Sequence, residues 1–136
     1  MIVAGIDYGR ARIGLAVAVD GRTVVPIGAI AERSRAASLE VLGRHLRELR
    51  VEQVIVGLPL NRDGSAGPQA QAAERFAAAL RQTTGLQIAM CDERLTSFEA
   101  RERLRTRPGR PRRNHGTIDA IAACAILETW LENHRR

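Results

Sequence analysis

Lysine is absent from this chain: lysine and arginine together number 21, and every one of these residues is arginine. Arginine carries a planar fork that pairs with phosphate through two hydrogen bonds, although the base composition of a genome can produce the same bias. Aromatic residues are also scarce, at 3% of the chain against 45% hydrophobic residues. The core must therefore be built mainly from alanine, valine, isoleucine and leucine.

Cysteines and long apolar runs are equally sparse. The two cysteines, Cys91 and Cys124, match neither a disulfide framework nor a zinc-binding spacing, and we expect both to be buried thiols. No stretch approaches the roughly 20 apolar residues of a membrane span. The N-terminus has no basic region followed by a long apolar one. We therefore expect a cytoplasmic protein without a membrane partner.

The basic residues that are present are unevenly distributed. The net charge is +6, and seven arginines but only one acid, Glu102, lie between Arg101 and Arg113. This segment predicts a surface that attracts phosphate, with Arg110, Arg112 and Arg113 as candidates for nucleic-acid contact. A solvated run of charge is the alternative. Because the segment has no aromatic side chain, recognition is expected to depend on backbone and shape.

The order of apolar patterns predicts an α/β fold in a single domain over residues 1–136. Three strands come first, at residues 2–6, 12–19 and 23–30, and the turn signal Asp20-Gly21 favours an antiparallel meander. Helix and strand patterns then alternate, at residues 39–49, 53–57, 73–80, 86–91, after 96–99 and over 117–132. Because strand–helix–strand crossovers impose parallel pairing, we expect a five-stranded mixed sheet flanked by helices. It would combine a three-stranded antiparallel meander with two parallel strands.

Three acids lie at the ends of buried elements. Asp7 directly follows the apolar run of residues 2–6, Glu93 follows the strand at 86–91, and Asp119 lies in the first turn of the last helix. An ionised carboxylate at the end of a buried strand is costly to desolvate, and a cation is the usual compensation. Open α/β sheets also place ligands beyond the carboxyl ends of their strands. The three acids together therefore predict a metal site.

Each acid also has a purely structural interpretation. Asp7 could accept hydrogen bonds from turn amides, Glu93 could pair with Arg94, and Asp119 could complement the helix dipole. Converging carboxylates suit Mg²⁺ or Mn²⁺, which prefer hard oxygen ligands. Two such ions can support cleavage of a phosphodiester bond, which is the mechanism that we favour.

Four motifs in order along the chain resemble those of the YqgF family, also called RuvX. They are Ile6-Asp7-Tyr8-Gly9-Arg10-Ala11-Arg12-Ile13-Gly14, Val56-Gly57-Leu58-Pro59-Leu60-Asn61 with Gly64, Asp92-Glu93-Arg94-Leu95-Thr96, and Ile118-Asp119-Ala120. The family consists of bacterial RNase H-like proteins described as pre-16S rRNA nucleases or Holliday junction resolvases. The resemblance covers essentially the whole chain. It implies an RNase H-like fold, an acidic triad of Asp7, Glu93 and Asp119, and Mg²⁺ or Mn²⁺ as the cofactor.

The function that the resemblance implies is cleavage of structured nucleic acid, and we favour processing of the 5′ end of pre-16S rRNA in ribosome biogenesis. One alternative is a Holliday junction resolvase acting on branched DNA. Another is a catalytically weak assembly factor that binds RNA or DNA. Resolvases usually act as dimers, and the sequence has no obvious dimer stripe, which tilts the choice toward RNA. We expect a monomer or a weak homodimer.

The chain departs from the related RuvC-type resolvases at two positions. Those enzymes are expected to carry an acid after the fourth strand, where this chain has Gly57-Leu58-Pro59. They also carry a fourth ligand three residues before the helix acid, and that position here is Gly116. His115 could substitute as a ligand, contact phosphate or simply be exposed.

Further candidates for nucleic-acid contact surround the acids. Arg10 and Arg12 flank Asp7 in sequence and could contact the scissile strand, although Arg12 could equally form a structural ion pair. Asn61 and Arg62 belong to a loop after a strand, where a simple turn is the alternative. Arg94, next to Glu93, is the remaining candidate.

One rival interpretation is a nucleotide binder of the sugar-kinase or actin type, because Asp7-Tyr8-Gly9 resembles the first phosphate loop of that superfamily. Those proteins clamp a nucleotide between two lobes. A chain of 136 residues is too short for two lobes.

Overall fold

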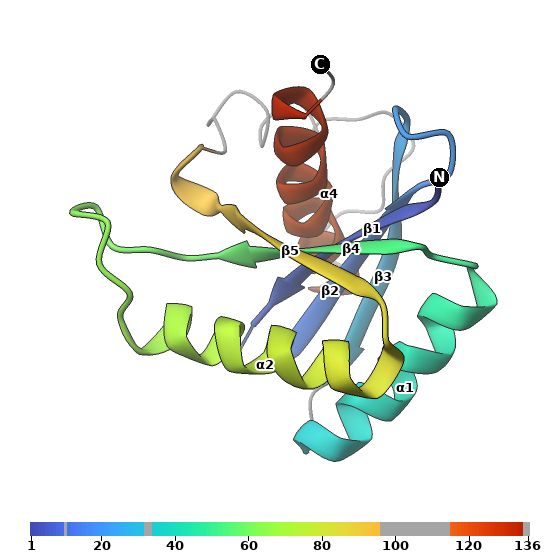
Figure 1. The fold of residues 1–136 in the computed structure, drawn as a ribbon, viewed down its shortest axis with the longest axis horizontal. Helices are drawn as coiled ribbons and strands as arrows, with labels where there is room; N and C mark the ends of the chain where they lie inside the picture. The colour runs from blue at the N-terminus through green and yellow to red at the C-terminus, as the bar shows by residue number, and fades with distance from the viewer. Residues whose placement is uncertain (10, 32–33, 96–114, 135–136) are drawn as a thin grey trace.

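The computed structural model describes residues 1–9, 11–31, 34–95 and 115–134. The described elements are β1 (Val3–Tyr8), β2 (Arg12–Ala18), β3 (Val24–Ala31), α1 (Arg35–Glu48), β4 (Gln53–Leu58), α2 (Pro68–Thr84), β5 (Gln87–Asp92), the 3-10 turn η1 (Glu93–Leu95) and α4 (His115–Asn133). Figure 1 shows their course through the molecule. The helix expected after residues 96–99 lies outside the described residues, as do Arg10, Arg110, Arg112 and Arg113.

The five strands form one mixed sheet in the order β3-β2-β1-β4-β5. Strands β1, β2 and β3 pair antiparallel, whereas β4 is parallel both to β1 and to β5. The predicted meander plus two parallel strands is therefore confirmed. Because β1, β4 and β5 run in the same direction, their carboxyl ends meet at one edge of the sheet.

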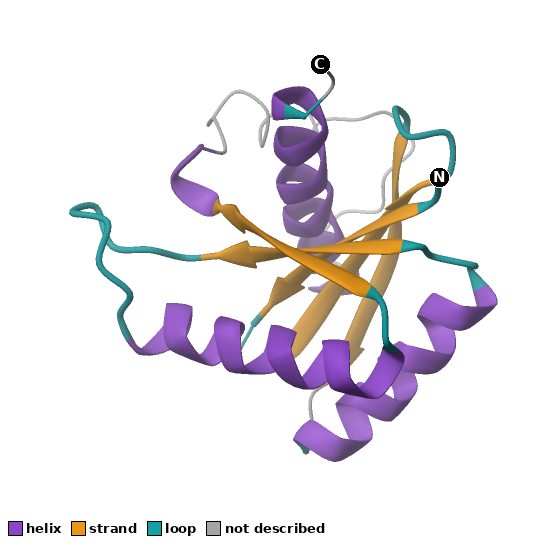
Figure 2. Ribbon diagram, in the orientation of Figure 1, coloured by secondary structure: helices purple, strands orange, loops and turns teal. Residues whose placement is uncertain are grey.

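Helices cover both faces of this sheet (Figure 2). Helix α4 packs on one face, where its residues join a core cluster with Val3, Ala16, Ile55 and Cys91. Helices α1 and α2 lie on the other face, where Phe76 and the leucines of both helices form a second cluster. Within the described part of the chain, no helix is both long enough and apolar enough to cross a membrane.

The local sequence explains where the covering helices begin and end. Ser34 caps α1, since its hydroxyl accepts a hydrogen bond from the Ala37 amide at 3.1 Å. Pro68 opens α2, where its missing amide hydrogen is no loss, and Gly85 ends that helix in the left-handed conformation at φ 73°. The leucine stripe predicted for α1 is buried at Leu39, Leu42 and Leu46.

Several predicted boundaries differ by one or two residues, and two of these differences affect the acids. Strand β1 continues through Asp7 to Tyr8, because both residues pair with β2 and the turn closes only beyond them, where the Gly9 amide donates to the Arg12 carbonyl at 3.0 Å. Helix α4 begins at His115 instead of residue 117, and its first turn contains no acid. Asp119 therefore lies one turn further along the helix, where its interaction with the helix dipole is weak.

Candidate active site

Asp7 lies between two glycines at the edge where β1, β4 and β5 end. It pairs with Gly14 of β2. One step beyond the Ile6–Val56 pair, Gly57 of β4 is its neighbour on the other side. Alternation along β1 directs the Asp7 side chain to the face that α4 covers. Neither neighbour has a side chain, so the atoms that flank Asp7 on this face come from other elements.

The Glu93 carboxylate and the tip of the Ile126 side chain share the space over Gly57. A Cβ atom added to Gly57 would lie 2.5 Å from Ile126 Cδ1, 3.0 Å from Glu93 Oε2 and 3.2 Å from Glu93 Cδ. Glu93 reaches this position because it begins the turn η1 directly after β5, the strand next to β4. The Glu93 carboxylate therefore lies over β4, the strand next to the one that carries Asp7.

The main chain of Asp119 occupies the corresponding space over Gly14. A Cβ atom added to Gly14 would overlap the main-chain oxygen of Asp119 and lie 3.2 Å from the Ala120 nitrogen. The backbone of α4 at Asp119 and Ala120 is thus in direct contact with the backbone of β2 at Gly14. Asp7, Glu93 and Asp119 therefore share one edge and one face of the sheet, although they are far apart in the sequence.

The Asp119 carboxylate is held by Arg12. Arg12 Nε donates to Asp119 Oδ2 at 2.6 Å, across 107 positions of sequence. Of the two interpretations of Arg12, the ion pair is thus present in the structure. Among the described residues, no three histidine, cysteine, aspartate or glutamate side chains are grouped tightly enough to hold a metal ion as they stand. The three carboxylates converge without closing into one cluster.

Arg94 braces the turn that carries Glu93. Its guanidinium pairs with Asp92, with Nη2 2.8 Å and Nε 3.1 Å from Asp92 Oδ2. The hydrogen bonds from Arg94 hold the pKa of Asp92 below its usual value. The same contacts raise the pKa of Arg94.

The loop after β4 is hydrogen-bonded to Arg94. Arg94 Nη1 donates to the Arg62 carbonyl at 3.4 Å and lies against Gly64, whose φ of 88° favours glycine. Asn61 closes the loop, since its side-chain amide donates to the Ser65 hydroxyl at 3.0 Å and its main-chain amide donates to the Ser65 carbonyl at 2.9 Å. The turn interpretation of Asn61 is thus observed, while nucleic-acid contact by Asn61, Arg62 and Arg94 stays a prediction.

Cys91 is a buried thiol beside these acids. It pairs with Gly57 across the sheet, and the residue is 4% exposed. Burial, together with the charges of Asp92 and Glu93, raises the pKa of Cys91 to about 11. A neutral, buried thiol is a poor ligand. Both cysteines are free and buried, as predicted.

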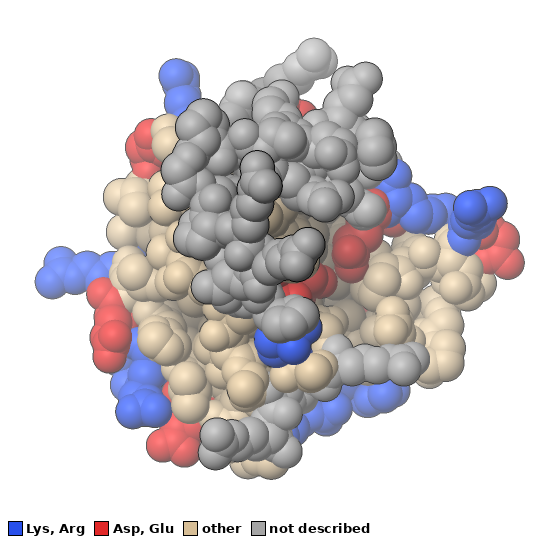
Figure 3. Space-filling model, turned by 180° about the vertical axis from the view of Figure 1, so that it is seen from behind, with Lys and Arg blue, Asp and Glu red and all other residues tan. Residues whose placement is uncertain are grey.

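Acidic and basic side chains lie close together on one face of the molecule (Figure 3). Seen from behind, acidic atoms gather near the middle of the visible face and arginine atoms border them (Figure 3). His115 is the first residue of α4, but its side chain is outside the described part. The prediction that it contacts nucleic acid or a metal therefore stays untested.

The sequence interpretation missed three residues that build the site. Gly14 and Gly57 make room for Asp119 and Glu93, and Asp92 anchors Arg94. All three were present in the recognised motifs. Their roles become visible only once the pairing of Asp7 with Gly14 and the approach of α4 to the sheet are known.

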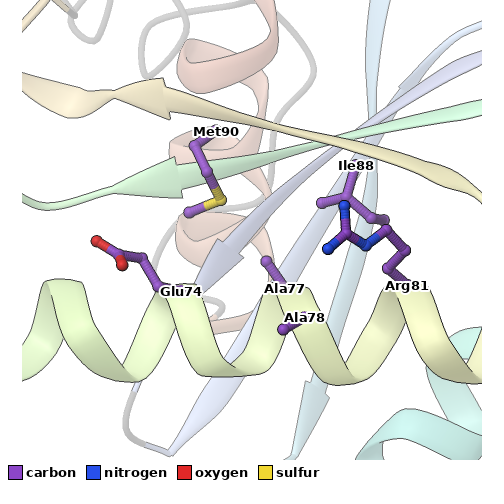
Figure 4. A pocket seen from close by; sticks show the side chains of 6 residues that line it. All are labelled: Glu74, Ala77, Ala78, Arg81, Ile88 and Met90. Atoms are coloured by element: carbon purple, nitrogen blue, oxygen red, sulfur yellow. The ribbon is translucent and has the colours of Figure 1, made fainter.

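A small pocket lies on the opposite face of the sheet (Figure 4). Its lining comes from α2 and β5, namely Glu74, Ala77, Ala78, Arg81, Ile88 and Met90. Because Ile88 and Met90 pack toward the core under α1 and α2, this pocket is separated from the acids by the sheet. It plays no part in the candidate site.

Comparison with solved structures defines the class of the fold. RuvC of Thermus thermophilus, solved with a Holliday junction substrate, matches with a TM-score of 0.69 at 18% identity, over 99% of this chain and 96% of that one. The Holliday junction resolvase of fowlpox virus matches with a TM-score of 0.61 at 13% identity, over 98% of this chain and 99% of that one. The fold is that of the RNase H-like nucleases and resolvases.

Sequence comparison defines the family. The model of the family described as "RuvX: Holliday junction resolvase" matches residues 1–133. A protein of Anaeromyxobacter sp. (strain Fw109-5) named "Putative pre-16S rRNA nuclease" is 46% identical over 129 residues, covering 94% of either chain. A protein of Synechococcus elongatus with the same name is 41% identical over 132 residues, covering 96% of this chain and 89% of its own. The chain belongs to the RuvX family.

Proposed function

We propose that this chain is a metal-dependent nuclease in which Asp7, Glu93 and Asp119 bind the metal. It is a hydrolase that cleaves phosphodiester bonds in nucleic acid, as its family membership indicates. The observation that carries the site assignment is Asp7 between Gly14 and Gly57, with Asp119 and Glu93 in the two spaces that these glycines leave.

The donor set fits Mg²⁺ or Mn²⁺. All three side chains offer hard carboxylate oxygens, and the neighbouring Cys91 thiol stays neutral. A side chain larger than that of glycine at position 57 would displace the Glu93 carboxylate and Ile126 Cδ1, so Gly57 leaves the room that the carboxylate needs. When bound, such an ion supplies an activated water and stabilises the leaving oxygen.

The protein's own residues then orient the substrate. Asp7 is on the central strand of the sheet and provides the most fixed ligand, while the Arg94 brace sets the direction of Glu93. Arg62 at the rim and the predicted contacts Arg10, Arg110, Arg112, Arg113 and His115 would bind backbone phosphates. Such contacts weaken steeply as the salt concentration rises.

The substrate that we propose is structured RNA, with maturation of the 5′ end of pre-16S rRNA as the reaction. The names of the relatives in Anaeromyxobacter and Synechococcus support this choice. Branched DNA is the second candidate, because the family model carries the description of a Holliday junction resolvase. We place the activity in the cytoplasm, in one domain over residues 1–136 that acts as a monomer or weak homodimer.

The test is a side-by-side cleavage assay on an RNA precursor with the 16S 5′ flank and on a four-way DNA junction, with Mg²⁺ or Mn²⁺ and mapped cut sites. We expect cleavage of the RNA, and Asp7→Asn should lower the rate at least about a hundredfold, since even residues that only support metal ligands contribute 10- to 100-fold. Asp20→Asn is the matched control, because Asp20 accepts hydrogen bonds only within the β2–β3 turn. Tight binding without cleavage of either substrate would contradict the proposal and indicate an assembly factor.

A further inference from the structure

Arg12 places a positive charge on one of the three acids of the site. Its Nε is 2.6 Å from Asp119 Oδ2, which is the distance of a strong, charge-assisted hydrogen bond. Arg12 therefore takes up one acceptor site of Oδ2, and its positive charge repels a second cation at this carboxylate. A divalent ion bound by Asp119 would have to share this carboxylate with Arg12 or displace it.

The backbones on both sides of this ion pair are fixed. Arg12 begins β2 and pairs with Ala31 of β3, whereas the main chain of Asp119 is pressed against Gly14. Neither end can move away without separating α4 from the sheet. The pair can open only by rotation of the two side chains.

The two partners differ in their access to solvent. The Arg12 side chain is 41% exposed and the Asp119 side chain is 21% exposed. A released guanidinium can therefore turn outward into water or toward a phosphate, while the carboxylate stays at the site. The exchange of partners is thus sterically simple for Arg12.

We infer that Arg12 is the resident counter-cation of Asp119, and that a divalent metal ion binds this site in competition with it. This inference rests on the proposed metal site. Without an ion, Arg12 offsets the mutual repulsion of three converging carboxylates. When an ion binds, Arg12 leaves Asp119 and is released at the edge where the substrate would lie. Arg12 therefore lowers the affinity of the free protein for that metal.

The expected effect of removing Arg12 on metal affinity is opposite to that of removing a metal ligand. Removal of an arginine next to a metal ligand should strengthen metal binding. Because a partly exposed ion pair is weak, the gain is expected to be about two- to fivefold in affinity.

The experiment is a titration of the full chain with Mn²⁺, with free ion measured by electron paramagnetic resonance. Arg12→Gln should raise the Mn²⁺ affinity about two- to fivefold. Arg62→Gln is the matched control, because Arg62 belongs to the loop that Arg94 contacts and its side chain forms no ion pair with a described residue. An equal rise in both variants would show a general charge effect and overturn the inference, as would unchanged or lower affinity in Arg12→Gln.

A double variant sharpens the result. In a background of Asp119→Asn, the further change Arg12→Gln should leave Mn²⁺ affinity unchanged, because the competing contact is already lost. If Arg12→Gln does not fold by circular dichroism, Arg12→Lys replaces it, with a smaller rise expected because the fork is lost but the charge is kept. Saturable Mn²⁺ binding by none of the proteins would overturn the proposed function together with this inference. Binding by the parent that does not respond to Arg12 would overturn the inference alone.

Discussion

The two strands beside Asp7 each place a glycine next to it, but different atoms fill the space that each glycine leaves. On the β2 side, Gly14 admits the main chain of Asp119, so helix and strand are locked together. On the β4 side, Gly57 admits only side-chain atoms, those of Glu93 and Ile126. One glycine thus serves the packing of the fold, while the other serves the placement of a carboxylate. Substitutions at the two positions should therefore separate stability from activity.

The largest expected effect is that of Gly14→Ala on stability. Its new Cβ would overlap the Asp119 carbonyl oxygen, so α4 would have to shift from the sheet. We expect the free energy of unfolding to fall by about 3 kcal/mol or more, because overpacking against backbone cannot be relieved by a rotamer change. Urea denaturation followed by circular dichroism measures this loss.

The control for that prediction is Gly43→Ala in α1. A Cβ there would meet only Thr84 Cγ2 at 3.7 Å, which is an ordinary contact. Since alanine favours a helix more than glycine does, this variant should be neutral or stabilised by up to about 1 kcal/mol. Equal destabilisation by both variants would contradict the role given to Gly14.

Gly57→Ala should lower the cleavage rate more than it lowers the stability of the fold. Its Cβ would displace the ends of two flexible side chains, so we expect a loss of about 1 kcal/mol in stability. The Glu93 carboxylate would move, however, and the cleavage rate should fall at least about tenfold. Rates measured on folded protein, together with urea midpoints, decide the outcome. A stability loss as large as that of Gly14→Ala would erase the distinction between the two flanks.

A smaller effect on the β4 flank is expected from Arg94→Gln, which removes the brace of Glu93. The cleavage rate should fall by about three- to tenfold, and Arg94→Lys should rescue little of it, because lysine lacks the fork that grips Asp92. Full activity in Arg94→Lys would indicate a simple phosphate contact instead.

Arg94→Gln should also change the titration of Asp92 at low pH. The lowered pKa of Asp92 in the folded chain means that its pair contributes stability above the ordinary value of 3.8, and that this contribution is lost as the pH falls through the lowered value. In Arg94→Gln the pKa of Asp92 should move upward toward 3.8. Carboxyl-carbon NMR titration of both proteins measures this shift. An unchanged titration would contradict the assignment of Arg94 as the cause.

The smallest effect concerns the thiol beside Gly57. With a pKa of about 11, Cys91 should remain protonated at pH 8 and react slowly with a disulfide reagent in the folded protein. Unfolding in urea should expose it together with Cys124. Rapid modification of the native chain would show that the β4 flank is open to solvent.

Much of this architecture was accessible from the sequence because it depends on local patterns. Alternation in the first strands and the leucine spacing of α1 predicted the elements, and the strand–helix–strand connections predicted the parallel pairing of the later strands. The three acids could be proposed since each ends or enters a buried element. The helix α4 started two residues early, because the pattern of apolar residues does not mark its first turn.

The contacts between the acids could not be predicted in the same way. The partner of Asp119 is 107 positions away, and the pairing of Asp92 with Arg94 competes with an equally plausible pair between Arg94 and Glu93. The choice depends on side-chain direction, which is set by strand register and by the approach of a helix. The roles of Gly14 and Gly57 likewise follow from register and not from residue type.

The position of β1 in the middle of the sheet has a consequence for motion. Its amides bond to strands on both sides, whereas β5 lies at the end of the strand order. Native proteins open first where fewer backbone bonds must break. Amide hydrogens around Asp7 should thus exchange with deuterium only on global unfolding, while those that carry Glu93 exchange through local openings. A bound ligand would then lose its contact with Glu93 during local openings while its contact with Asp7 persists.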